Sequence, residues 1–273
     1  MNEPITSRQN TRVKNAAKLR DRSGRESQRR IIIDGVREIS RALDAGVELL
    51  EAFVCERRLR DDGRQLAARL SSGPVEVVAV TEPVFAKLTF GDRADGVVAV
   101  ARPPQFDLAS VTLKREMLVA ILERLEKPGN VGAVMRSADA VGLDAVITAD
   151  GGTDRYNPNA IRASAGTIFA LPLIAATREE ALTWLRSHDF RVLAARVDGA
   201  VDYTAASFAG RCAIVVGSEA QGLSEAWHSG DVVSVKLPMR GRGDSLNVSV
   251  TAAVLFYEAL RQRQANSSRS GSP

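Results

Sequence analysis

The sequence predicts an α/β protein whose larger part is built on a parallel β-sheet. The 273 residues are enough for about two domains of ordinary size. Apolar residues make up 45% of the chain and charged residues 26%, a composition typical of folded globular proteins. From residue 117 onward, short apolar runs alternate with segments of helical period. This alternation is typical of a parallel sheet covered by helices on both faces.

The first hundred residues predict a small α/β domain. Residues 13–19 have the pattern of a short basic helix, and the runs at 30–34, 49–55, 75–80 and 97–101 are typical of strands. Two further helices are expected at 36–46 and 63–70. The consecutive Pro103 and Pro104 then interrupt any helix or central strand. We therefore expect a first domain over residues 1–102 and a linker over 103–114.

The second domain is expected over residues 115–264. Its predicted strands are 117–122, 145–148, 171–175, 191–195, 213–217 and 232–237, and its predicted helices are 131–141, 178–187 and 246–261. In sheets of this kind, ligands bind in the loops that follow the carboxyl ends of the strands. The small polar residues of 265–273 predict a disordered tail.

Composition also excludes several classes of protein. No run approaches the ~20 apolar residues of a membrane-spanning helix, and the first twenty residues lack the apolar core of a secretory signal. Cys55 and Cys212, with His188 and His228, have no spacing typical of a disulfide framework or a zinc site. We therefore expect a cytoplasmic protein with no metal and no membrane partner.

Positive charge is concentrated near the N-terminus. The net charge of the chain is +4, yet nine basic and two acidic residues lie between Arg8 and Arg30, so this segment alone carries +7. Such a concentration favours a polyanionic partner, because each phosphate that is neutralised releases condensed counterions. The candidate contacts to nucleic acid are Lys14, Arg25, Arg29 and Arg30. A solvated helix face is the alternative that the charge leaves open.

The first of three unusual loops leads into the helix expected at 131–141. Asn130 is a good N-cap residue, and Gly142 can end the helix. Arg136 lies in the second turn, close to the apolar stripe that includes Val131 and Met135. Burying an unpaired guanidinium is very costly. Arg136 therefore predicts either an intramolecular ion pair or a contact with a ligand.

The second loop follows the strand expected at 213–217 and reads GSEAQGLS over residues 217–224. Its two glycines allow the backbone to approach a ligand closely. A P-loop would need lysine where Leu223 stands, and no G-x-G-x-x-G dinucleotide fingerprint occurs in the chain. A nucleoside-like ligand without a triphosphate therefore fits better than ATP or NAD. A plain tight turn is the alternative.

The third loop, residues 237–249 (LPMRGRGDSLNVS), leads into the helix expected at 246–261. Gly241 and Gly243 make it flexible, and Ser245 is placed to cap the helix. Asn247 and Ser249 lie inside the first turns, where their helix propensity is poor. Capping explains Ser245 and leaves Asn247 as a candidate ligand contact.

These three loops, in this order and spacing, resemble the three motifs of the SpoU/TrmH branch of the SPOUT superfamily. The matching runs are PGNVG with Arg136, GSEAQGL at 217–223, and LPM followed by SLNVS within 237–249. Residues 157–164 (NPNAIRAS) are similar to a further family segment. Residues 1–100 look like the appended RNA-binding domain of the family, which resembles a ribosomal-protein fold. They carry Asp34-Gly35 where family members more often have Glu-Gly.

Members of this branch are S-adenosylmethionine-dependent RNA 2′-O-ribose methyltransferases. The resemblance implies a deep trefoil knot in the second domain and a homodimer that shares its active site across the interface. It implies that the cofactor binds Ala194, Ala195, Gly217, Ser218, Glu219, Gly222, Leu237, Met239 and Leu246. It implies a reaction centre of Asn130, Arg136, Glu219, Ser245 and Asn247. Arg162 is expected to contact RNA phosphate.

The resemblance leaves the RNA open. The sizeable N-terminal domain favours ribosomal RNA, with transfer RNA, or a non-catalytic RNA-binding protein of the same fold, as alternatives. A guanidinium is a poor base at neutral pH. We therefore expect Arg136 to bind the adjacent phosphate and stabilise the developing alkoxide. Ser245 and Asn247 would orient these groups, and Glu219 would position the motif loops. Methylation of a base rather than a ribose also stays open.

Overall fold

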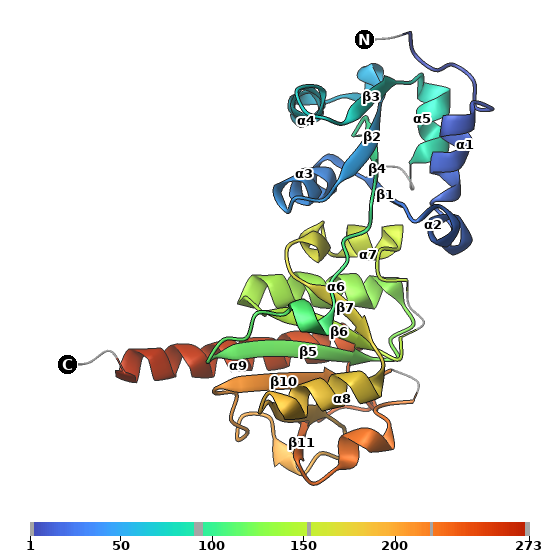
Figure 1. The fold of residues 1–273 in the computed structure, drawn as a ribbon. Helices are drawn as coiled ribbons and strands as arrows, with labels where there is room; N and C mark the ends of the chain where they lie inside the picture. Colours follow the sequence, from blue (N-terminus) through green and yellow to red (C-terminus); the bar gives the residue numbers. More distant parts are fainter. Residues whose placement is uncertain (1–2, 90–94, 152–153, 219–220, 271–273) are drawn as a thin grey trace. The chain divides into compact units, whose positions relative to one another are not determined.

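A computed structural model describes residues 3–89, 95–151, 154–218 and 221–270, with side chains up to residue 266 (Figure 1). The chain divides into two compact units. The first comprises Met1–Pro104 together with Asp154–Ala170, and the second comprises Gln105–Thr153 together with Leu171–Pro273. Residues 154–170 were predicted to belong to the second domain, whereas they pack with the first unit.

The first unit is built on a four-stranded sheet with the strand order β1-β4-β2-β3. Its strands are β1 (Ile31–Asp34), β2 (Leu49–Val54), β3 (Glu76–Ala79) and β4 (Val97–Ala101). β4 pairs antiparallel with β1 and β2, and β3 pairs parallel with β2. Its α-helices are α1 (Thr11–Lys18), α2 (Arg22–Gln28), α3 (Val36–Asp44), α4 (Asp61–Ser71), α5 (Glu82–Leu88) and α7 (Pro158–Ala163).

Three of these helices were not expected from the sequence pattern. α2 has the sequence RSGRESQ, which contains no apolar residue to show a helical period. α5 and α7 span seven and six residues, too few for a period to be visible. Both carry a proline in the first helical turn, a position that proline favours. Buried Val84 and Phe85 of α5 pack with Val13 and Leu19 in the core of this unit.

The segment 154–170 makes close contacts with α3 inside the first unit. Arg41 Nη1 donates a hydrogen bond of 2.9 Å to the carbonyl oxygen of Ala165. Gly166 has a φ of +85°, and a Cβ at this position would lie 2.9 Å from the Cα of Glu38. Both the backbone conformation and the close approach therefore require glycine here.

The second unit contains a seven-stranded sheet with the order β7-β6-β5-β10-β8-β11-β9. Its strands are β5 (Met117–Glu123), β6 (Ala145–Ala149), β7 (Leu173–Ala176), β8 (Arg191–Ala195), β9 (Val201–Asp202), β10 (Arg211–Val216) and β11 (Val232–Lys236). Every pair of neighbouring strands is parallel. The predicted parallel sheet is confirmed, with the short β9 as an additional edge strand.

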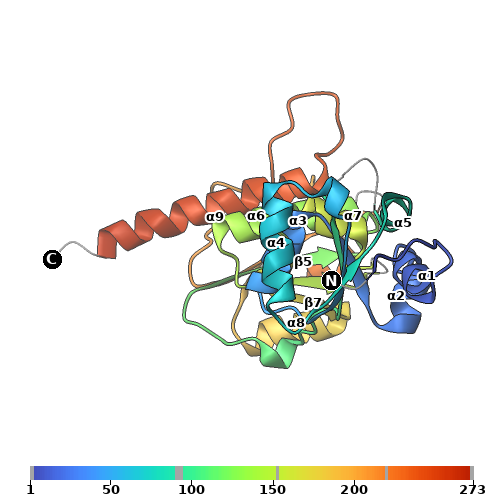
Figure 2. The same cartoon turned by 90° about the horizontal axis from the view of Figure 1, so that it is seen from above.

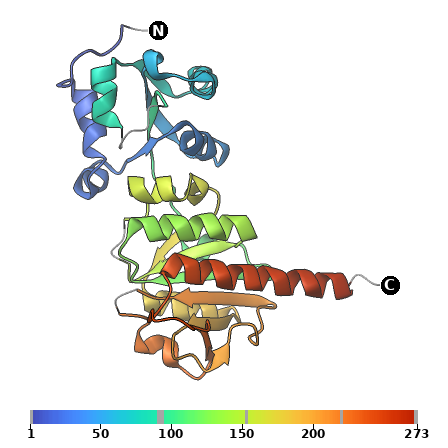
Figure 3. The ribbon, with the colours of Figure 1, turned by 180° about the vertical axis from the view of Figure 1, so that it is seen from behind.

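Helices cover both faces of this sheet. They are α6 (Pro128–Val141), α8 (Arg178–Ser187) and α9 (Val248–Ser270). Val119 and Ile121 of β5 pack in one core with Trp184 of α8. Because side chains alternate along a strand, the equally buried Leu118 and Ala120 face the opposite side. There, α6 packs against α9 and α9 against β10. The opposite views of Figures 1 and 3 show α8 on one face and α6 with α9 on the other.

α9 continues through residues that the sequence analysis assigned to a disordered tail. The helix runs to Ser270. The chain has no glycine or proline between Gln264 and Gly271, so nothing in this stretch forces the helix to stop. Residues 271–273 of the expected tail lie outside the described residues. At its other end, α9 is preceded by a loop that projects from the second unit (Figure 2).

Candidate active site

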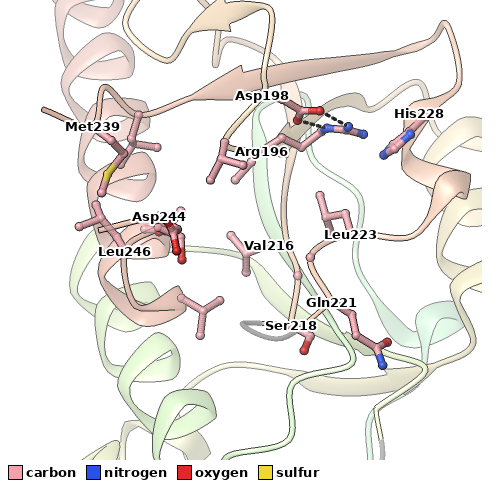
Figure 4. A pocket seen from close by; sticks show the side chains of 18 residues that line it. Arg196, Asp198, Val216, Ser218, Gln221, Leu223, His228, Met239, Asp244 and Leu246 are labelled. Atoms are coloured by element: carbon pink, nitrogen blue, oxygen red, sulfur yellow. Dashed lines mark hydrogen bonds and ion pairs between the residues drawn. The ribbon is translucent and has the colours of Figure 1, made fainter. Parts of the chain in front are cut away.

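A pocket of about 400 Å³ opens at the carboxyl ends of β8, β10 and β11 (Figure 4). This is where ligands bind in open parallel sheets, and the volume is in the range of small-molecule sites. Its walls come from the segment after β8, the glycine loop after β10, and the loop between β11 and α9. The predicted residues that line it are Ala195, Gly217, Ser218, Gly222, Leu237, Met239, Ser245 and Leu246.

The glycine loop folds back tightly on itself beside the pocket. The backbone N–H of Gly222 donates to the carbonyl oxygen of Ser218 at 2.8 Å. A Cβ at Gly217 would lie 2.5 Å from the carbonyl oxygen of Gly222, and Gly222 itself has a φ of +66°. Both glycines are therefore required by the fold of the loop. Glu219, assigned to the cofactor and to the reaction centre, lies outside the described residues.

A buried carboxylate holds the far end of this loop. Glu123, at the end of β5, is fully buried and accepts hydrogen bonds from the backbone N–H and from the hydroxyl of Ser224, at 2.8 and 2.5 Å. Arg124 Nη1 donates to Oε1 of Gln221 at 3.0 Å, and Gln221 lines the pocket. The neighbouring strand thus fixes the loop at two points. This anchor was not predicted, because spacing along the sequence does not show that residues 123 and 224 lie side by side.

The third wall of the pocket leads into α9, and the N-cap residue of this helix differs from the one predicted. Asn247 Oδ1 accepts from the backbone N–H and the hydroxyl of Ser249, at 3.0 and 2.6 Å, and α9 starts at the next residue, Val248. Asn247, rather than Ser245, is therefore the N-cap. Its Nδ2 also donates to Oδ1 of Asn130 at 3.3 Å. The first and third motifs therefore meet through two amide side chains.

The first motif also differs in detail from the prediction. α6 begins at Pro128, so Asn130 lies within the first turn and is not the N-cap. Proline at this position has the backbone angle of the helix already fixed. Gly142 ends the helix with a φ of +74°, as predicted.

Arg136 is exposed on α6, so burial does not demand a partner for its guanidinium. It makes no ion pair with any residue that the structure describes, and the intramolecular pair considered from the sequence is not found there. Arg136, Asn130 and Asn247 do not line the pocket of this single chain, and Ala194 is buried in the core that contains Trp184 of α8.

One end of the pocket carries polar groups that the sequence analysis missed. Arg196 donates from Nε and Nη2 to the two carboxylate oxygens of Asp198, each at 2.8 Å (Figure 4). This hydrogen bonding lowers the pKa of the Asp198 carboxyl to about 2. His228 lies at the same end, away from Met239 and Leu246. Arg196 and Asp198 directly follow β8, so the strand-end rule applied to Ala195 could have found them.

The N-terminal candidates for nucleic-acid contact have different environments. Lys14, Arg29 and Arg30 are exposed. Arg25, in contrast, is only 5% exposed, and it pairs with Asp154 within the first unit. The assignment of Arg25 as an RNA contact is therefore corrected, because its charge is buried and already satisfied. Arg162 is partly buried on α7, also in the first unit.

A membrane-spanning helix and a metal-binding cluster are both absent from the described residues. None of the helices in those ranges combines the length and apolar character needed to cross a bilayer. The same ranges contain no cluster of three or more His, Cys, Asp or Glu side chains placed to hold a metal ion.

Comparison with known proteins identifies relatives for both units. The SpoU rRNA Methylase family matches residues 117–257, and an MRM3-like substrate binding domain matches residues 10–99. A 23S rRNA (uridine(2479)-2′-O)-methyltransferase of Streptomyces viridochromogenes is 31% identical over 95% of this chain and 92% of its own.

Two solved structures are similar over nearly the whole chain. A crystal structure of an RNA 2′-O ribose methyltransferase is 42% identical and covers 96% of this chain and 100% of its own, with a TM-score of 0.84. The SpoU methyltransferase AviRb from Streptomyces viridochromogenes, in complex with AdoMet, is 28% identical with a TM-score of 0.86. It covers 94% of this chain and 99% of its own.

Proposed function

The chain belongs to the SpoU rRNA methylase family, and from that premise we propose that it methylates a ribose 2′-hydroxyl of ribosomal RNA. Its second unit has the knotted SPOUT fold of the family. The observation that carries the proposal is the pocket, because residues 217, 218, 221 and 222 of the second motif loop and 237, 239 and 244–246 of the third line it together. The methyl donor is S-adenosylmethionine.

The pocket fits this cofactor on its own chemistry. Leu223, Leu237 and Leu246 supply apolar walls of the kind that hold a nucleoside, while Arg196 and Asp198 supply charges at one end. The absence of side chains at 217 and 222 leaves the loop backbone open to a ligand. Neither a triphosphate cradle nor a metal cluster is needed for this donor, which when bound supplies an electrophilic methyl group on a sulfonium.

We assign the proton and charge management to the residues around Arg136. Its guanidinium is exposed and unpaired among the described residues, so it is available to an RNA phosphate. From there it stabilises negative charge on the attacking ribose oxygen. Asn130 and Asn247 contact each other and join α6 to the start of α9. Ser245 lines the pocket and orients the groups that meet there.

We propose that the protein acts as a homodimer. Val250 and Tyr257 of α9 are 47% and 54% exposed. They lie seven residues apart and so share one face of the helix. An exposed apolar stripe of this kind is typical of a protein interface. Within one chain, Arg136 does not line the pocket. A partner docked on this face of α9 would therefore supply groups that complete the site. Because ribosomal RNA is the substrate, we place the reaction in the cytoplasm.

Transfer of a labelled methyl group tests the proposal directly. The protein is incubated with tritiated S-adenosylmethionine and unmodified ribosomal RNA, with unmodified transfer RNA as a parallel sample. We expect label in ribosomal RNA and a nuclease-resistant 2′-O-methyl linkage at the modified position. Label only in transfer RNA would refute the assigned substrate, and label in a base would refute the assigned atom. Binding of RNA without transfer would refute the enzymatic assignment.

A further inference from the structure

The loop between β11 and α9 has two faces with different chemistry. Leu237, Met239, Asp244, Ser245 and Leu246 line the cofactor pocket. The residues 240–243 between them have the sequence RGRG and do not line it. All residues of 238–247 are exposed, and Figure 2 shows the loop projecting from the second unit. The pocket function of this loop therefore leaves 240–243 unexplained.

The two arginines of this loop are not used to hold together the part of the chain that the structure describes. Neither Arg240 nor Arg242 makes a hydrogen bond or ion pair with any residue within the described ranges. Two other arginines of the second unit are paired: half-buried Arg196 with Asp198 at the pocket, and exposed Arg186 with Asp231 at the amino end of β11. A flexible cationic side chain left unpaired beside an active site is suited to bind an anion that arrives with the substrate.

The two glycines are also not required by the fold. A Cβ at Gly241 would meet no atom within 4 Å, and a Cβ at Gly243 would meet only ordinary contacts at 3.9 Å. Neither has a backbone angle in the left-handed region. Gly217, in the neighbouring loop, shows the opposite case, with a contact at 2.5 Å. What glycine adds at 241 and 243 is freedom to change conformation or to let a ligand approach the backbone.

We propose that residues 240–243 form an RNA-binding arm at the mouth of the cofactor pocket. Arg240 and Arg242 bind phosphates that flank the methylated ribose, and the glycines allow the arm to close on the RNA backbone. This inference rests on the proposed function and extends it. Residues 240–243 are neither among those expected to bind the cofactor or form the reaction centre nor part of the N-terminal unit. The arm reads phosphate and shape and not base identity.

Salt dependence of RNA binding measures these contacts. The variants Arg240→Gln and Arg242→Gln are compared with wild type and with Arg115→Gln. Arg115 is the matched control: it is exposed, unpaired among the described residues, and precedes the amino end of β5, whereas the pocket lies at the carboxyl ends of the strands. The probe is unmodified large-subunit ribosomal RNA over a series of KCl concentrations. Calorimetry measures S-adenosylmethionine binding to each variant.

We expect each of the two variants to bind the RNA more weakly. The slope of log affinity against log salt should flatten by about 0.7 to 0.9 per arginine. Affinity for S-adenosylmethionine in the absence of RNA should match wild type. A slope equal to that of Arg115→Gln would overturn the proposal. So would a parallel loss of cofactor affinity, because it would indicate collapse of the pocket wall instead of a lost RNA contact.

The glycines give a second, independent measurement. Gly241→Ala has no steric cost in the free protein, and neither has Gly230→Ala, the matched control in an exposed turn outside the pocket. We expect only Gly241→Ala to lower RNA affinity, by about fivefold or more, because the closed arm places residue 241 in a backbone conformation that glycine adopts freely and alanine only with strain. Equal behaviour of the two variants would contradict the closing arm. If wild type methylates no RNA, the proposed function fails; if it does and these variants match their controls, only the arm fails.

Discussion

The buried pair of Arg25 and Asp154 provides a sharp test of the reasoning that separates structural from RNA-binding arginines. Arg25 Nε donates to Oδ2 of Asp154 at 2.6 Å, and Nη2 donates to the same oxygen. Nη1 donates to the carbonyl oxygens of Leu19 and Arg20 at 2.6 and 2.7 Å. The substitution Asp154→Asn keeps the size of this partner and removes its charge.

The expected loss of folding stability follows from the burial of both charged side chains. The Arg25 side chain is 5% exposed and that of Asp154 is 19% exposed. Removing one charge of a buried pair costs about 3–5 kcal/mol, because the other charge stays buried without compensation. The partial exposure of Asp154 and the two carbonyl acceptors place the expected value near the lower end, about 3 kcal/mol. The matched control is Glu26→Gln, which breaks the exposed Arg22–Glu26 pair of α2 and should leave the free energy of unfolding almost unchanged.

Urea unfolding distinguishes the two units. Both tryptophans, Trp184 and Trp227, lie in the second unit, so their fluorescence reports on that unit, while far-ultraviolet circular dichroism also reports on the first. With an m-value of about 2 kcal/mol/M, we expect Asp154→Asn to lower the midpoint of the first unit by about 1.5 M. The tryptophan transition should stay in place. A shift no larger than that of Glu26→Gln would refute the structural role of Arg25 and return it to the RNA-binding candidates.

Three further predictions concern the active site and the thiols. Arg136→Ala should retain S-adenosylmethionine binding and lose methyl transfer by a factor of about 100 or more; near-normal turnover in single-turnover assays would contradict its role. Arg196 lowers the pKa of the Asp198 carboxyl to about 2, so the pair stays ionised at neutral pH. Its contribution to cofactor affinity should be lost only as pH falls from about 4 towards 2. Cofactor affinity measured by calorimetry should therefore not titrate through this pair between about pH 5 and 8, and a titration there that Asp198→Asn abolishes would disprove this. Burial raises the pKa of the Cys212 thiol to about 12 and also raises that of Cys55, so a thiol reagent should react only after unfolding; prompt reaction of the native protein would contradict the buried positions.

The sequence predicted the parallel sheet well because its strands are buried on both faces. β8 was predicted to the residue, and β5 and β6 to within one residue, since continuous apolar runs mark strands covered on both sides. Where burial and composition do not coincide, prediction failed. α2 has no apolar residue to reveal it, and Arg25 has the same local sequence character as exposed Arg29. Its burial depends on Asp154, which is 129 residues away.

The candidate site was predicted from motif residues, and its errors are geometric. The cap assigned to Ser245 belongs to Asn247, because the position where α9 starts depends on how the loop leaves the pocket. Asn130 was displaced from the cap by the preference of Pro128 for the first helical turn. The ionic groups at 196 and 198 were missed because the predicted strand was taken to end the site at Ala195. Motif spacing thus located the loops, whereas the contacts between them required coordinates.

Because residues 154–170 belong to the first unit, the two units cannot be recombined between related enzymes as two consecutive segments of chain. The polypeptide passes between the units three times, after 104, 153 and 170, instead of once. A fragment ending at residue 104 would lack α7, the acidic partner of Arg25 and the Gly166 turn that contacts α3. Recombination at Pro103 and Pro104 alone would therefore give a hybrid in which residues 1–104 and 154–170 of the first unit come from different proteins. Grafting a new recognition module onto this catalytic scaffold requires both stretches to be inherited together.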